Sequence, residues 1–146
     1  MSLFSKMSES VKNYNEKQKE LANIRGGLVL SASTDYVGGY DEAKGSTGVI
    51  NIYNNQVEYR NIIIKKPDIK NVSIEGQDQA SRRVTMTRLL LIGVFAFAAK
   101  KKRKDRETYL VFELVDGREV IFFFKDTPPM QMRAKLSTFS QGIRAK

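Results

Sequence analysis

The chain has 146 residues, of which 41% are hydrophobic and 28% are charged, so its composition is that of one folded domain rather than a disordered segment. It contains no cysteine and no histidine, which excludes disulfides, thiolate nucleophiles, zinc sites built from Cys and His, and the commonest general base. The net charge of +9 is unevenly spread, because residues 100–106 hold six Lys or Arg and one Asp.

The N-terminal segment, residues 1–25, predicts an amphipathic helix over residues 2–25. Its apolar side chains recur at alternating spacings of three and four residues, the seam of a heptad pattern. The seam consists of Phe4, Met7, Val11, Tyr14, Gln18 and Leu21. Gly26-Gly27 is expected to end the helix and to act as a hinge. Three uses of the seam stay open: packing on the chain's own domain, coiled-coil-like self-association into a homo-oligomer, and contact with a membrane interface.

Residues 27–146 predict a mainly β domain of about seven strands with flanking helices, an α+β arrangement. The strands are expected at residues 28–33 with an extension to 40, 49–53, 56–60, 62–64, 69–74, 83–88, 109–115 and 118–124. Asn54-Asn55 is expected to form a tight hairpin turn, because Asn tolerates the positive φ that such turns require.

Residues 108–124 contain the strongest local signal, because Asp116-Gly117 lies between two apolar stretches and is typical of a tight hairpin turn. A two-residue turn would pair Val115 with Arg118, Phe112 with Ile121 and Leu110 with Phe123. Both faces of the resulting hairpin are mostly apolar, so each face needs a cover. The barrel interior would cover one face, and a helix or a second subunit would cover the other.

The C-terminus predicts a helix over about residues 128–144. Thr127 is a candidate N-cap, and Pro128 suits the first helical position. One apolar stripe runs along the helix and is expected to pack on the barrel. The stripe consists of Met132, Leu136, Phe139 and Ile143.

An apolar block of 11 residues, Leu89–Ala99, leads directly into the basic run of residues 100–106. A helix that crosses a bilayer needs about 20 apolar residues, so the block predicts a buried segment and no transmembrane span. The basic run predicts an exposed loop, because six such charges are not buried without partners. Its candidate residues for binding an anionic partner are Lys100, Lys101, Lys102, Arg103, Lys104 and Arg106. A purely solvated loop is the alternative.

No residue pattern predicts catalysis, a metal site or a cofactor. The acidic residues do not cluster in the sequence, and Gly26-Gly27 and Gly38-Gly39 match neither dinucleotide nor P-loop spacing. The chain is therefore expected not to be an enzyme. Since the first residues lack the pattern of a secretory signal, a cytoplasmic location is expected, with peripheral attachment to a membrane as one use of the basic run.

Two segments carry a family resemblance: residues 83–102, RVTMTRLLLIGVFAFAAKKK, and residues 109–113, YLVFE. From about Gly27 to its end, the chain resembles bacterial and phage proteins with a pleckstrin-homology-like (PH-like) domain. The resemblance implies a seven-stranded, partly open barrel of orthogonal sheets capped by a C-terminal helix. Members that bind phosphoinositides use paired basic residues on the first strands, whereas this sequence has only Lys44 between Leu28 and Tyr53.

The expected function is that of a non-enzymatic binding or adaptor module, because that barrel hosts lipid, peptide and protein binding alike. It would dock on a protein partner or an anionic membrane surface through the basic run. The alternative is a nucleic-acid-binding or effector-blocking protein of phage origin that uses the same run for phosphate contacts.

Overall fold

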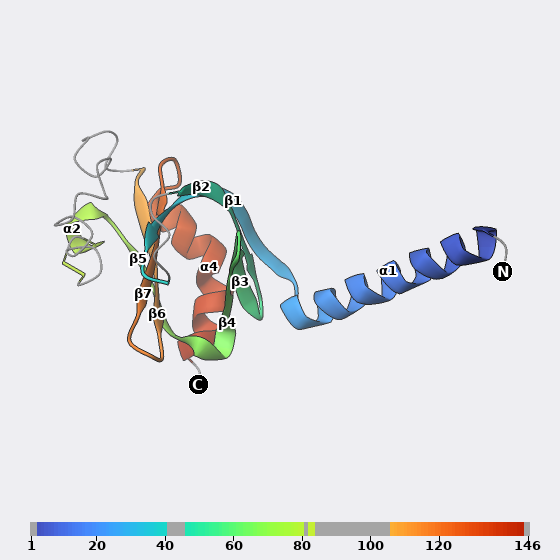
Figure 1. Cartoon of the computed structure of the whole chain (residues 1–146). Helices are drawn as coiled ribbons and strands as arrows, with labels where there is room; N and C mark the ends of the chain where they lie inside the picture. The colour runs from blue at the N-terminus through green and yellow to red at the C-terminus, as the bar shows by residue number, and fades with distance from the viewer. Residues whose placement is uncertain (1–2, 41–45, 81, 84–105, 145–146) are drawn as a thin grey trace.

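The computed structural model describes residues 3–40, 46–80, 82–83 and 106–144 (Figure 1). Residues 84–88 of the strand predicted at 83–88, the apolar block Leu89–Ala99 and the basic residues 100–104 lie outside the described residues. Helix α1 (Leu3–Arg25) comes first, a curved sheet follows, and helix α4 (Pro129–Arg144) comes last. The mainly β, α+β prediction with a helix at each end is confirmed.

All seven described strands belong to one antiparallel sheet in the order β4-β3-β2-β1-β7-β6-β5. Their bounds are β1 (Leu28–Gly38), β2 (Ser46–Tyr53), β3 (Gln56–Tyr59), β4 (Ile62–Lys65), β5 (Ile69–Glu75), β6 (Thr108–Leu114) and β7 (Glu119–Phe124). The sheet is not closed, so β4 and β5 form its two edges. The short helix η1 (Lys66–Asp68) joins these edge strands, and the single turn α2 (Gln77–Ala80) follows β5.

The sheet curls around α4, whose apolar stripe forms part of the main core (Figure 1). Met132, Leu136 and Phe139 are fully buried, and Ile143 is nearly so. The ring of Phe139 meets that of Phe112 on β6 edge-on, with centroids 6.5 Å apart. The predicted packing of the C-terminal stripe on the sheet is therefore confirmed.

The β6–β7 hairpin forms around Asp116-Gly117 as predicted, but its predicted register is wrong by one residue. The N–H of Leu114 donates to the carbonyl of Arg118 at 2.8 Å, which leaves a three-residue loop with Gly117 at φ 94°. Glu113 therefore lies opposite Glu119. Since a slip of one residue moves every side chain to the other face, Val120, Phe122 and Phe124 share the core face with Leu110 and Phe112.

The opposite face of this hairpin is also buried, as its apolar pattern predicts. Tyr109, Val111, Ile121 and Phe123 form a second apolar cluster there. Val37 of β1 and Ala80 of α2 belong to the same cluster, so α2 supplies part of the expected helical cover.

Asn54-Asn55 joins β2 to β3 in two residues, as predicted, but without positive φ. Among the described residues other than glycine, only Arg60 has a positive φ, at 49°. The turn instead binds the end of α1, because the N–H of Asn55 donates to the carbonyl of Arg25 and that of Asn54 to the carbonyl of Gly27, both at 2.9 Å. The predicted hinge at Gly26-Gly27 is thus a connection held to the sheet by hydrogen bonds.

Candidate functional site

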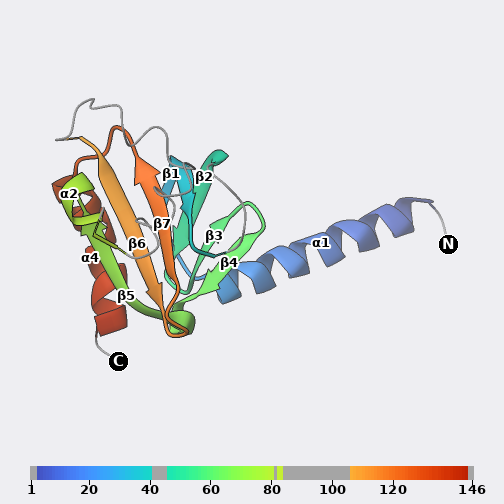
Figure 2. The same cartoon turned by 60° about the vertical axis from the view of Figure 1, so that its left-hand side comes forward.

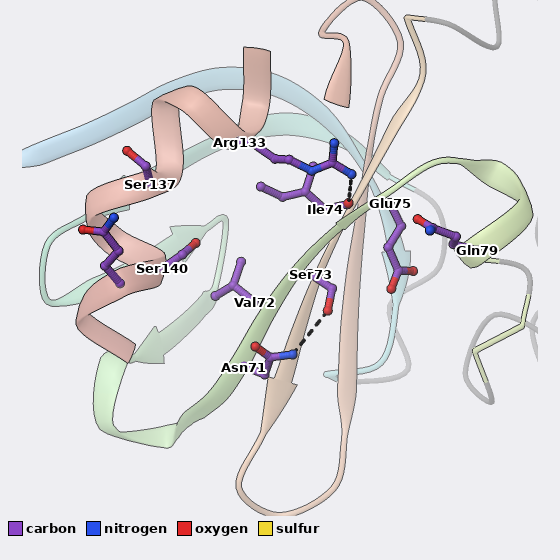
Figure 3. A pocket seen from close by; sticks show the side chains of 10 residues that line it. Asn71, Val72, Ser73, Ile74, Glu75, Gln79, Arg133, Ser137 and Ser140 are labelled. Atoms are coloured by element: carbon purple, nitrogen blue, oxygen red, sulfur yellow. Dashed lines mark hydrogen bonds between the residues drawn. The ribbon is translucent and has the colours of Figure 1, made fainter. Parts of the chain in front are cut away.

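A groove of about 570 Å³ runs between the edge strand β5 and the helix α4 (Figure 3). Strand residues form one wall and residues from one side of α4 form the other. The lining residues are Asn71, Val72, Ser73, Ile74, Glu75, Gln79, Arg133, Ser137, Ser140 and Gln141. Most of these side chains are polar, so the groove offers many hydrogen-bonding groups along an apolar floor.

The strand wall also offers main-chain groups, because β5 pairs with β6 on one side and with no described strand on the other. The guanidinium of Arg133 donates to the carbonyl of Ile74 at 3.1 Å, so this carbonyl faces the free edge (Figure 3). The N–H and C=O of one strand residue point to the same side and those of its neighbours to the other. Val72 and Ile74 therefore direct their main-chain groups toward the groove.

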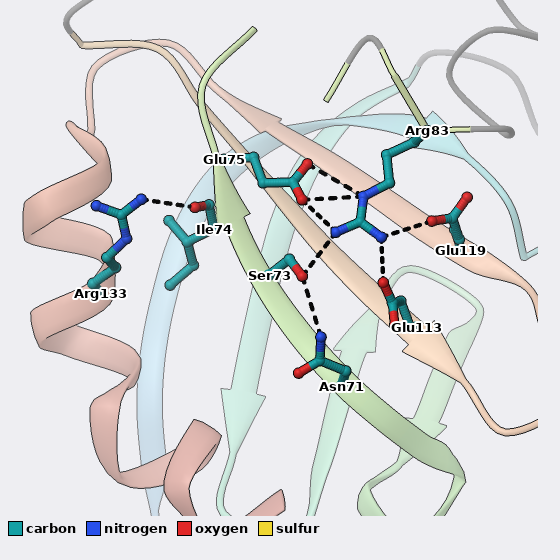
Figure 4. Close-up of polar contacts among 8 residues, drawn as sticks. All are labelled: Asn71, Ser73, Ile74, Glu75, Arg83, Glu113, Glu119 and Arg133. Carbon is teal, nitrogen blue, oxygen red and sulfur yellow. Dashed lines mark hydrogen bonds and ion pairs between the residues drawn. The ribbon is translucent and has the colours of Figure 1, made fainter. Parts of the chain in front are cut away.

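A cluster of charged side chains fixes the outer surface of β5 (Figure 4). The guanidinium of Arg83 contacts the carboxylates of Glu75, Glu113 and Glu119, and it donates to the hydroxyl of Ser73 at 2.9 Å. The hydrogen bond to Glu75, followed by those to Glu113 and Glu119, raises the pKa of Arg83 further above its ordinary value although burial lowers it. The cluster keeps an excess of two negative charges beside the groove.

The fold thus brings together acidic residues that do not cluster in the sequence. Glu113 and Glu119 come together across the β6–β7 ladder, and Glu75 joins them from β5. No local spacing in the sequence signals this arrangement, because it depends on the hairpin register and on the neighbour of β6. The sequence contains one signal of the groove, the alternation of polar and apolar residues at 69–74. This alternation predicts a strand, but it does not predict that the strand lies at the edge of the sheet.

The predicted binding residues of the basic run are only partly described. Arg106 is exposed just before β6, and Lys100, Lys101, Lys102, Arg103 and Lys104 lie outside the described residues. The predicted seam lies on α1, where Met7, Val11 and Tyr14 are 61%, 59% and 62% exposed and Leu21 is 37% exposed. The side chain of Phe4 lies outside what the structure describes. Among those that the structure describes, none lines the groove.

No model of a known protein family matches the chain, and no curated protein matches it. The case for a function therefore depends on the groove, the charged cluster and the exposed helix. Among the described residues, no helix combines the length and the apolar character needed to cross a bilayer.

Proposed function

We propose that the protein is a cytoplasmic, non-enzymatic binding module of PH-like fold that holds an extended segment of a protein partner between β5 and α4. The observation that carries this proposal is the free edge of β5 facing a groove that α4 walls (Figure 3). An extended peptide binds such an edge as an added strand, with main-chain hydrogen bonds for affinity and side-chain pockets for specificity. The strand order and the closing helix support the PH-like part of the proposal.

The main-chain contacts would come from the outward N–H and C=O groups of Val72 and Ile74. Alternate side chains of the added segment would then face α4, where Ser137 and Ser140 supply hydroxyl groups. Their small size leaves room for the bound segment. Polar partners on α4 would favour a ligand with polar side chains at these alternate positions.

In the free protein, Arg133 covers part of the free edge of β5. Its contact with the carbonyl of Ile74 covers a main-chain acceptor that would otherwise be open to any strand. Since Arg133 is exposed, it can move aside when a ligand donates to the same carbonyl. The negative excess around Arg83 favours a ligand with a basic side chain at the end of the groove near Glu75.

A selection from a random peptide library on the immobilised full chain tests the proposal. Ser137→Trp fills the groove, whereas Thr138→Trp places the same bulk on the next residue, which does not line it. Peptides selected on the wild type should bind the Thr138→Trp variant unchanged and lose at least tenfold in affinity for the Ser137→Trp variant. Equal affinity for both variants, or a selection that yields no binder, would refute the groove as the binding site.

The basic run stays a second, predicted contact of the same module with an anionic surface. Arg106 is its one described basic residue, and its exposure agrees with that use. Vesicle and nucleic-acid binding by charge-reversed variants tests this contact separately from the groove.

A further inference from the structure

Helix α1 extends away from the sheet (Figures 1 and 2). The apolar side chains of its seam that the structure describes are exposed. With 23 residues it is about 35 Å long. Met7, Val11 and Tyr14 are each about 60% exposed, although they form the apolar side of the helix. Ser and Asn, which recur along α1, are weak helix formers, and so are Val11 and Tyr14. A helix of this composition depends on packing of its apolar side for stability.

The chain's own sheet does not cover the described side chains of the seam, because the end of α1 next to the sheet is held in a fixed direction. Arg25 makes a two-point ion pair with Glu58, at 2.6 and 3.0 Å, and its guanidinium lies 5.2 Å from the ring centre of Tyr53. Gly26 has φ 76°, and a Cβ there would lie 2.9 Å from the side chain of Asn55. These contacts hold the helix in a direction that points away from the sheet.

The distribution of charge on α1 indicates what kind of partner would cover its apolar seam. The side of α1 away from the seam carries three Lys and three Glu, so it has no net charge. These residues are Lys6, Lys12, Lys19, Glu9, Glu16 and Glu20. A helix that lies on an anionic membrane needs a polar side rich in Lys and Arg, which α1 lacks.

The positions that flank the seam are nearly uncharged. They are Ser8, Ser10, Asn15, Lys17, Ala22 and Ile24. Charged residues at these positions normally select the partner of a coiled coil, and Lys17 is the one such residue here. A seam without charged selectors matches a copy of itself as well as any other helix.

We propose that two copies of the protein form a dimer through antiparallel pairing of their α1 helices. In this pairing Val11 packs against Tyr14 of the partner subunit, and Met7 against Gln18 of the partner subunit. α1 carries five Lys or Arg and three Glu, a net charge of +2, so the rest of each chain carries +7 of the total +9. The antiparallel direction is favoured because it separates these two positively charged parts. Antiparallel helices hold these basic bodies about 35 Å apart, well beyond the screening length of about 8 Å.

The mass of the full chain in solution tests whether the dimer forms. Light scattering and sedimentation equilibrium should give twice the 16.6 kDa mass of the chain. Val11→Glu should return the chain to a monomer, whereas Asn13→Glu, which places the same charge on the opposite side of the helix, should leave the dimer intact. A monomeric wild type, or equal effects of the two substitutions, would overturn the proposal.

Disulfide cross-linking tests the direction of the helices. Because the chain has no cysteine of its own, only the introduced cysteines can form a disulfide. A mixture of the single variants Met7→Cys and Gln18→Cys should oxidise to the mixed disulfide, which mass spectrometry distinguishes from each symmetric one. In the antiparallel pair, position 7 of one copy lies about 16 Å along the axis from position 7 of the other, too far for a disulfide. Symmetric disulfides alone, or no disulfide at all, would overturn the antiparallel pairing.

Discussion

Removing Arg83 should destabilise the fold through the three carboxylates that it leaves behind. The side chain of Arg83 is 19% exposed, and that of Glu75 is 12% exposed, so solvent screens their interaction only in part. Arg83→Met removes the charge-assisted hydrogen bonds and leaves Glu113 directly opposite Glu119 on neighbouring strands. We expect a loss of about 2–4 kcal/mol in the free energy of unfolding, from the lost bonds and the uncompensated charges.

Urea unfolding followed by circular dichroism measures this loss. Arg82→Met is the matched control, because Arg82 is the exposed neighbour and should change stability by less than about 0.5 kcal/mol. Equal losses for the two variants would show that the Arg83 cluster adds nothing to stability.

A second substitution gives a sharper test because its effect should change sign. In the wild type, Glu119→Gln weakens a contact with Arg83 at 2.9 Å and should destabilise the fold. In the Arg83→Met background the same change removes a repulsion between opposed carboxylates and should restore about 1 kcal/mol. Destabilisation by Glu119→Gln in both backgrounds would contradict the electrostatic account.

Three further outcomes are expected. Leu136→Ala, at a fully buried position of α4, should cost about 2–5 kcal/mol in urea unfolding, and a loss below about 0.5 kcal/mol would show that the stripe is not core. Burial, together with the charge of Glu107, raises the pKa of Tyr109. The contribution of Tyr109 to the free energy of unfolding should therefore be complete below the unfolded pKa of about 10 and should decrease as the pH rises above it. Tyr109→Phe should reduce this loss of stability at high pH, whereas Tyr14→Phe should not. Reversing the charges of Lys101 and Arg103 should weaken sedimentation with anionic vesicles if the basic run docks on lipid, or flatten the salt dependence of binding if it docks on nucleic acid. A wild type that binds neither at low salt would remove both hypotheses.

The sequence predicts the helices and strands well because their signals are local. Period-two stretches become strands, the stripe from Met132 to Ile143 becomes the buried side of α4, and Asp116-Gly117 becomes a hairpin loop. The register of that hairpin is not local in the same way. Two- and three-residue loops both accommodate Asp-Gly. The two loops differ by one residue in register, so a given β7 side chain lies on one face with the first loop and on the opposite face with the second. The apolar residues do not decide between them, because both faces of the hairpin are buried.

The groove and the charged cluster are beyond sequence reasoning for a different reason. Both depend on which strands become neighbours in space. Residues 69–74 predict a strand in any sheet position, but only as the edge beside α4 do Val72 and Ile74 offer main-chain groups to a ligand. Arg83 likewise meets Glu113 only after β5 and β6 pair.

The two proposed surfaces lie on different parts of the molecule, which makes them separable. α1 joins the body beside the β2–β3 turn, whereas β5 and α4 lie toward the far side (Figure 2). Dimerisation through α1 would therefore leave both grooves open. Val11→Glu should abolish the dimer without changing the affinity for a single groove-selected peptide, and Ser137→Trp should abolish peptide binding without changing the mass. Loss of both properties in either variant would mean instead that the helix and the groove form one site.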